Sequence, residues 1–152
     1  MKFSTREDID LPAAALFAAI TDFPKIERVL VRRGARLRRM DGNPQPSLGN
    51  AWLVDFDWRG RARELRLQVT GLAPPERLNI AGASEHFNLE VSATVVALSP
   101  SKSRLLFELS MQPRGMKARL MLQTAKLGKG QLDRKFAERI GDLVGKLASG
   151  TA

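Results

Sequence analysis

Apolar and polar residues alternate along residues 51–58 and 61–69, and this period of two predicts a β-hairpin. Between the two segments stands Arg59-Gly60, which suits a two-residue turn because glycine readily adopts a positive φ. The other face of this hairpin is mostly polar, and it pairs Asp57 with Ala62, Asp55 with Glu64, and Leu53 with Arg66. Counting outward from the turn gives four pairs on the apolar face: Trp58 with Arg61, Phe56 with Arg63, Val54 with Leu65, and Trp52 with Leu67.

The same alternation predicts further strands on both sides of this hairpin. Residues 86–98 and 104–111 form a second candidate hairpin around the turn SPSK. Weaker strand patterns cover residues 2–9, 34–41 and 76–82, the last after a break at two prolines, so we expect about seven antiparallel strands. Pairing Ser99 with Ser103 in the second hairpin places Val95 beside Phe107 and Ala93 beside Leu109.

Three segments have the 3.6-residue period of an amphipathic helix. Residues 11–20 carry Pro12, which suits a first helical turn, and residues 23–31 follow Asp22, a typical N-cap. Gly128 and Gly130 interrupt a longer third pattern, each costing about 1 kcal/mol relative to alanine, so this helix either bends there or brings bare backbone against the sheet. The third stripe extends over about eight turns: Ala118, Leu122, Ala125, Leu132, Phe136, Ile140, Leu143 and Leu147.

This order of elements resembles the helix-grip fold of the START-like superfamily (SRPBCC), which includes polyketide cyclases and dehydrases, lipid-transfer domains and coenzyme Q-binding proteins. The resemblance covers essentially the whole chain and rests on ITDFPKIERV, GNAWLVDF, GLAPPERL and the terminal helical stripe. It implies an α+β fold, in which a curved antiparallel sheet of about seven strands wraps around a long C-terminal helix and encloses an apolar cavity. It implies no shared catalytic motif. We expect residues 1–148 to form a single START-like ligand-binding domain, with a frayed tail at 149–152.

The predicted inward face contains two arginines near the turn of the first hairpin. A sheet face in full contact with a helix should be apolar throughout, whereas the mouth of a cavity admits Arg where an anionic ligand reaches it. Arg61 and Arg63 are therefore candidates for a cationic rim beside aromatic rings; alternatively, they extend past the sheet edge and cover those rings. For each apolar residue on this face taken alone, plain core is the simpler interpretation. The candidate ligand-binding residues are Trp52, Val54, Phe56, Trp58, Arg61, Arg63, Leu65, Leu67, Phe87, Leu89, Phe107, Leu109, Met111 and Met121.

Positive charge is concentrated in one segment. The chain has a net charge of +9, and six of the twelve residues 28–39 are arginine. Such a segment attracts phosphates of nucleic acid or of anionic lipids, although it lacks the interleaved aromatic residues that stack on bases. The alternative is that these arginines are solvated and reflect a general preference for Arg over Lys. The candidate basic patch is Arg28, Arg32, Arg33, Arg36, Arg38 and Arg39.

The chain offers few groups for catalysis. With no cysteine it has no disulfide, thiolate metal site or cysteine nucleophile, and it has no tyrosine. His86 is the only histidine, and alternation places it on the outward face, as it does Asp55, Asp57 and Glu64. We therefore expect no metal and no cofactor, and the sequence leaves open whether the protein is an enzyme.

Three functions remain. The first is binding or carrying an apolar small molecule (a lipid, isoprenoid or polyketide-like compound), with an anionic membrane surface as a further candidate partner. The second is a cyclase or dehydratase acting in the same cavity, and the third is a ribosome- or RNA-associated module that uses the basic patch. The segment MKFSTREDID is charged where a signal peptide needs an apolar run, so we expect a cytoplasmic protein that at most attaches to a membrane surface. The sequence indicates nothing about oligomeric state.

Overall fold

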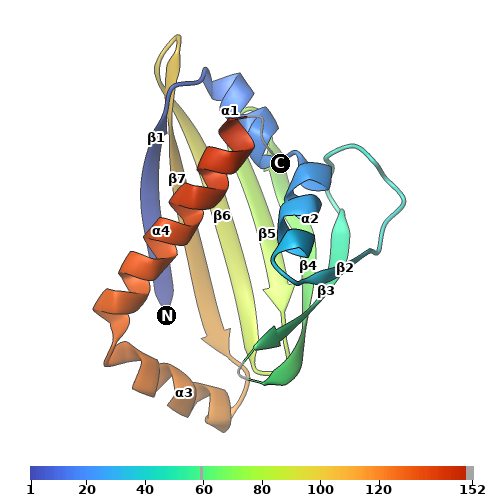
Figure 1. Cartoon of the computed structure of the whole chain (residues 1–152), viewed down its shortest axis with the longest axis vertical. Coiled ribbons are helices and arrows are strands. Elements are labelled where there is room, and N and C mark those ends of the chain that lie inside the picture. The colour runs from blue at the N-terminus through green and yellow to red at the C-terminus, as the bar shows by residue number, and fades with distance from the viewer. Residues whose placement is uncertain (59, 150–152) are drawn as a thin grey trace.

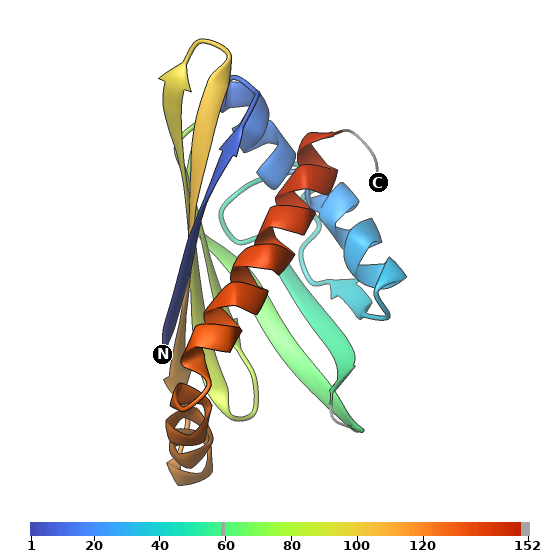
Figure 2. The ribbon, with the colours of Figure 1, turned by 60° about the vertical axis from the view of Figure 1, so that its left-hand side comes forward.

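Seven antiparallel strands form one curved sheet in the computed structural model, which describes residues 1–58 and 60–149 (Figure 1). The order across the sheet is β1-β7-β6-β5-β4-β3-β2, so the first strand closes one edge and a four-residue strand closes the other. Figure 2 shows that α1, α2 and α4 lie to one side of the sheet, whereas α3 lies at its lower end. The strands are β1 (Lys2–Ile9), β2 (Arg36–Arg39), β3 (Ala51–Trp58), β4 (Arg61–Ala73), β5 (Arg77–Ala83), β6 (Phe87–Ser99) and β7 (Lys102–Pro113).

The helices follow the predicted pattern, except that the C-terminal stripe is divided. Two short helices, α1 (Ala13–Ile20) and α2 (Phe23–Arg32), follow β1, and the Asp22 carboxylate caps α2 by accepting a hydrogen bond from the Lys25 amide. The C-terminal stripe forms α3 (Met116–Lys126) and α4 (Lys129–Ala148). The chain changes direction at Gly128, the N-cap of α4, so the interrupting glycines mark a bend. α4 crosses the sheet diagonally and α3 lies across its lower end (Figure 1).

The predicted register of the first hairpin is confirmed, and that of the second is wrong by two residues. β3 and β4 pair Trp58 with Arg61 and Trp52 with Leu67, as counted from the turn; Arg59 of that turn lies outside the described residues. In β6–β7, however, Val95 pairs with Leu105 and Ala93 with Phe107. Because side chains alternate with a period of two, a shift of two residues keeps every apolar side chain on the same face, so the pattern alone could not exclude it. Ser99 pairs with Lys102 instead of Ser103, after a register irregularity between Ala97 and Ser99, so the turn is shorter than predicted.

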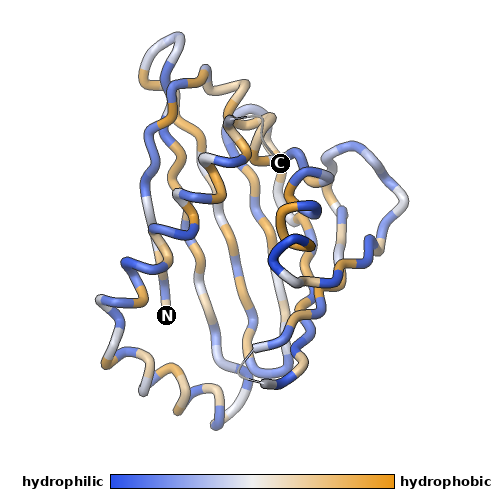
Figure 3. The backbone as a smooth tube through the Cα atoms, in the orientation of Figure 1, coloured by the Kyte–Doolittle hydropathy of each residue, from blue (hydrophilic) through white to orange (hydrophobic). Residues whose placement is uncertain are grey.

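The apolar core occupies only part of the concave face. It is built where α1, α2 and α4 meet the sheet, from buried residues that include Leu16, Phe17, Leu105 and Val144. Phe87, Leu89 and Met111, nearer the α3 end, are only half-buried and lie outside this cluster. Figure 3 shows apolar residues continuing along the strands toward that end. The sheet therefore extends beyond the helices that pack on it, and part of its apolar face is not covered by the core. None of the helices within residues 1–58 and 60–149 is long and apolar enough to cross a membrane.

Candidate functional site

An inner cavity of about 210 Å³ lies between the sheet, α2 and α4. Its lining is apolar apart from Glu27, whose carboxylate accepts a 2.8 Å hydrogen bond from Trp52 Nε1. α2 and α4 supply much of the wall because their apolar stripes face the sheet. The strands supply the floor. Representative lining residues are Ile26, Leu30, Ile80, Val91, Ile140 and Leu143.

Trp52 lies at one side of this cavity, where Glu27, Phe23 and Arg39 each contact its ring. Its ring is edge-on to Phe23, with 4.9 Å between centroids, and the Arg39 guanidinium carbon lies 4.8 Å from the ring centre. Arg39 also donates to Asp41 Oδ1 at 2.7 Å. Trp52 is only 5% exposed, so it forms a rigid wall. Arg39, which the sequence groups with the exposed arginines, is half-buried and has a structural role at this wall.

A larger outer cavity of about 820 Å³ lies at the end of the sheet beside α3. Apolar side chains come from both hairpins and from α3, among them Phe56 of β3, Phe87 of β6 and Met121 of α3. Trp58 is 46% exposed and stands at its margin. Several charged side chains line this space, whereas Glu27 is the charged residue that lines the inner cavity: Arg63, Arg66, Arg114, Glu64 and Glu85.

Arg63 is the arginine that the inward face of the sheet contributes to the outer cavity. It pairs across the hairpin with Phe56, and its guanidinium carbon lies 5.4 Å from the Trp58 ring centre. Its Nε is buried and has no hydrogen-bond partner within the described part of the chain. A buried donor without an acceptor is unfavourable, so an anionic or polar ligand atom that reaches this nitrogen would be stabilised by it. Arg61 is exposed and lines neither cavity, so the two predicted rim arginines occupy different environments.

His86 lines the outer cavity, and the prediction that it faces outward is wrong. Its side chain is 19% exposed. β6 begins at Phe87, so His86 belongs to the preceding turn, where strand alternation does not apply. Arg114 fixes this turn, because its backbone amide donates to the His86 carbonyl at 2.7 Å and its Nη1 donates to the Ser84 carbonyl. His86 Nε2 lies 3.9 Å from Glu85 Oε2.

The predicted ligand-binding residues divide between the two cavities. Val54 is buried in the core, and Leu109 lines neither space. The predicted ligand-binding residues included neither the wall residues of α2 and α4, which the sequence indicated only as helical stripes, nor Arg114, and His86 was predicted to face outward. Trp52, Leu67 and Phe107 line the inner cavity. Phe56, Trp58, Arg63, Leu65, Phe87, Leu89, Met111 and Met121 line the outer one.

The two cavities are in line along one face of the sheet. Leu65 and Leu67 are successive inward positions of β4, and the first lines the outer cavity while the second lines the inner one. Leu89 and Val91 have the same relationship on β6. Between these strands lies Gly82, where an added Cβ would come within 3.0 Å of Leu67 Cδ2. Glycine is therefore required at this position, because Leu67, Leu89 and the Arg66 carbonyl already occupy the space that a side chain would need.

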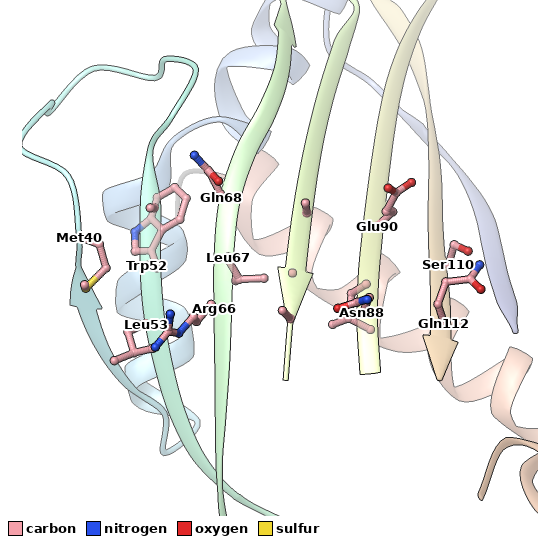
Figure 4. Close-up of a pocket in the computed structure, with 15 residues that line it drawn as sticks. Met40, Trp52, Leu53, Arg66, Leu67, Gln68, Asn88, Glu90, Ser110 and Gln112 are labelled. Carbon is pink, nitrogen blue, oxygen red and sulfur yellow. The ribbon is translucent and has the colours of Figure 1, made fainter. Parts of the chain in front are cut away.

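A third hollow, of about 780 Å³, lies on the opposite face of the sheet (Figure 4). In that view the helices lie behind the strands, and Arg66, Gln68 and Glu90 point away from them. Ala81 and Ala83 line its floor, so short side chains between longer ones account for the depression. It has mixed charge, and it shares Arg66, Ala83 and Leu89 with the lining of the outer cavity.

Five of the six arginines in the predicted basic patch are exposed. Arg28 lies within α2, Arg33 is the C-cap of that helix, and Arg38 lies on the edge strand β2. Arg36 Nη2 approaches Asp57 Oδ1 only to 3.9 Å, a weak surface interaction. Arg32 is exposed as well. No three or more His, Asp or Glu side chains within residues 1–58 and 60–149 are grouped as a metal site would require.

Comparison with known proteins identifies the fold. No protein-family model matches the chain, and no curated protein matches it significantly in sequence. Among solved structures, the Zhui aromatase/cyclase from Streptomyces is similar over 100% of this chain and 99% of its own, with a TM-score of 0.69 and 10% identity. Ara h 8.0201 is similar over 98% of each chain, with a TM-score of 0.64 and 13% identity.

A START superfamily protein from Mycobacterium smegmatis covers 91% of this chain and 98% of its own, with a TM-score of 0.58 and 15% identity. With these neighbours, the curved seven-stranded sheet and the C-terminal helix across it define the α+β helix-grip fold of START-like proteins. The fold expected from the sequence is thereby confirmed.

Proposed function

We propose that this protein binds and carries an apolar small molecule of the lipid, isoprenoid or polyketide class, whose apolar part enters the inner cavity and whose anionic end meets Arg63. The observation that carries this proposal is the arrangement of the two cavities on one sheet face, with a buried, unpartnered Arg63 Nε at the outer one. The fold neighbours agree with it, since they include an aromatase/cyclase and a START superfamily protein.

The volumes favour a ligand that extends through both spaces. Small-molecule sites usually measure about 300–1,000 Å³. The inner cavity, at about 210 Å³, is below that range, whereas the outer cavity, at about 820 Å³, is within it. An elongated amphiphile places its apolar end among Val91, Ile140 and Leu143 and keeps its polar end in the outer space.

Arg63 and Arg61 provide a matched test of the anionic end. Two fluorescent probes share an arylamine body: anilinonaphthalene sulfonate is anionic and phenylnaphthylamine is neutral. Arg63→Ala should weaken binding of the sulfonate by about tenfold or more, because a charge-assisted hydrogen bond is lost, and leave the neutral probe unaffected. Arg61→Ala, which removes the same charge outside both cavities, should change neither. Equal effects of the two variants, or no binding of either probe, would contradict the proposal.

His86 favours a second candidate, a cyclase or dehydratase that acts on a substrate in the same space. Such an enzyme needs a group that accepts or donates a proton inside the pocket, and His86 lines the outer cavity beside Glu85. The test is incubation with a reactive poly-β-keto thioester and analysis of the cyclised products. An enzyme predicts a product distribution that differs from the spontaneous one and returns to it in His86→Gln. A carrier predicts the spontaneous distribution in both.

A further inference from the structure

The outer surface of α3 exposes three large apolar side chains. Met116 is 68% exposed, Leu120 is 56% exposed, and Leu127, immediately after the helix, is 90% exposed. Figure 3 shows apolar and polar segments alternating along α3, as in an amphipathic helix. Single exposed leucines are common, but a cluster on one helix face indicates an interaction surface.

Helical geometry brings these three residues together. Successive residues of an α-helix are about 100° apart, so Met116, Leu120 and Leu127 fall within about 40° of one another around the axis. The backbone of Leu127 keeps helical torsion angles, with φ −64° and ψ −29°, so it continues this face. On the opposite side, Ala118 and Leu122 are buried against the molecule. α3 is therefore held by one face and presents an apolar ridge on the other.

Basic side chains flank the ridge. The same geometry places Lys117 on one side of it and Arg119 and Lys126 on the other, all three exposed. The sequence has no Asp or Glu from Leu109 to Leu132. An exposed apolar ridge between cations matches the surface of an anionic bilayer, where apolar side chains enter the acyl boundary and ammonium groups remain among the phosphates.

We infer that α3 docks the protein on an anionic membrane surface through Met116, Leu120 and Leu127. Nucleic acid fits this surface less well, because its phosphates offer nothing to three exposed aliphatic side chains. The inference goes beyond the proposed function and does not depend on it, since docking can be measured without a ligand. Where both hold, Met121 on the same helix brings the outer cavity next to the bilayer.

The test is sedimentation of the full chain with vesicles of phosphatidylcholine alone and of phosphatidylcholine containing one third phosphatidylserine. The unaltered protein should bind the anionic vesicles and bind the neutral ones weakly. The double variant Leu120→Ser, Leu127→Ser keeps the charge and should lose about tenfold or more in partitioning, because two apolar side chains no longer enter the bilayer. The matched control is Met40→Ser, Leu48→Ser, which removes two similarly exposed apolar side chains elsewhere and should bind normally.

Charge variants separate α3 from the arginine segment. Lys117→Gln with Lys126→Gln should weaken binding to the anionic vesicles, whereas Arg33→Gln with Arg38→Gln should leave it unchanged. The inference is overturned if the arginine pair has the larger effect, or if Leu120→Ser, Leu127→Ser binds vesicles as the unaltered protein does. It is also overturned if the protein binds RNA but not vesicles, or if the serine variant only converts a dimer into a monomer.

Discussion

Lys25 Nζ donates a hydrogen bond to the backbone carbonyl of Leu147, with 3.1 Å between the two atoms. Lys25 lies on α2 and is 7% exposed, and Leu147 lies in the last turn of α4. The last carbonyls of a helix have no partner within the helix and carry partial negative charge, so an ammonium group stabilises them. The bond joins the two helices that close the inner cavity over the sheet.

Removing this ammonium should destabilise the fold. Lys25→Met keeps most of the buried aliphatic chain but leaves the Leu147 carbonyl without its donor, so the free energy of unfolding should fall by about 1–3 kcal/mol. Urea unfolding followed by circular dichroism measures it. Lys146→Met serves as the control, because Lys146 is an exposed cation in the same last turn of α4. Equal losses in the two variants would show that only the general charge near the helix end matters.

Asp41 organises the loop that leads from β2 into β3. Its carboxylate accepts hydrogen bonds from Arg39 Nε, the Ala51 amide, Asn50 Nδ2 and the Asn43 amide. Arg39 has the largest effect, and together these donors hold the pKa of Asp41 well below its usual value of 3.8. Arg39 in turn lies over Trp52, so the loop supports one wall of the inner cavity.

The lowered pKa predicts how stability depends on pH. A carboxyl group whose pKa is lower in the folded than in the unfolded state stabilises the fold above its unfolded value, and this contribution is lost as the pH falls toward the folded value. Asp41→Asn should therefore destabilise the protein at about pH 7, and the difference from the unaltered protein should narrow below about pH 4. Urea unfolding across this range measures it. Asp142→Asn, an exposed change on α4, should have the same free energy of unfolding as the unaltered protein at each pH. A difference for Asp41→Asn that does not vary with pH would contradict the account.

Filling the inner cavity should weaken the binding of an apolar probe. Val91 lines the cavity, whereas Val96 on the same strand is 40% exposed. Val91→Phe should weaken phenylnaphthylamine binding by about tenfold or more because the ring occupies the ligand's space. Val96→Phe adds the same ring without entering the cavity and should bind normally.

Stability distinguishes a cavity from a filled core. An extra ring in a fully packed interior costs about 1–3 kcal/mol, so Val91→Phe should lose less than that where space already exists. Thermal unfolding of both phenylalanine variants measures this. Strong destabilisation by Val91→Phe with unchanged probe binding would indicate that the interior is filled and that the probe binds elsewhere.

Local signals predicted the fold well where a turn defined the register. Gly60 fixes the β3–β4 turn, so counting from it placed every pair of that hairpin correctly. The β6–β7 hairpin lacks such a marker, and its apolar pattern is unchanged by a shift of two residues. Glycine is unfavourable inside a helix, so Gly128 and Gly130 indicated either a bend or bare backbone against the sheet, and the structure has the bend at Gly128.

The predicted part of the site lies mainly on strands, with Met121 of α3 in addition. Phe56, Arg63 and Phe87 follow from alternation, and all three line the outer cavity. His86 and Arg114 flank β6 and β7 in turns, where no periodicity indicates a direction, and sequence reasoning therefore missed them. Tertiary packing also determines which arginines are buried. Arg39 packs against Trp52 at the cavity wall, while Arg61 is exposed.

Native mass spectrometry of the purified protein, followed by organic extraction and analysis of the extract, addresses the ligand itself. The unaltered protein and Val96→Phe should each retain one apolar molecule with an acidic group, whereas Val91→Phe should be recovered at the mass of the bare chain. Recovery of all three proteins as bare chains, together with no uptake of phenylnaphthylamine by any of them, would contradict the claim that the sheet encloses space for a ligand.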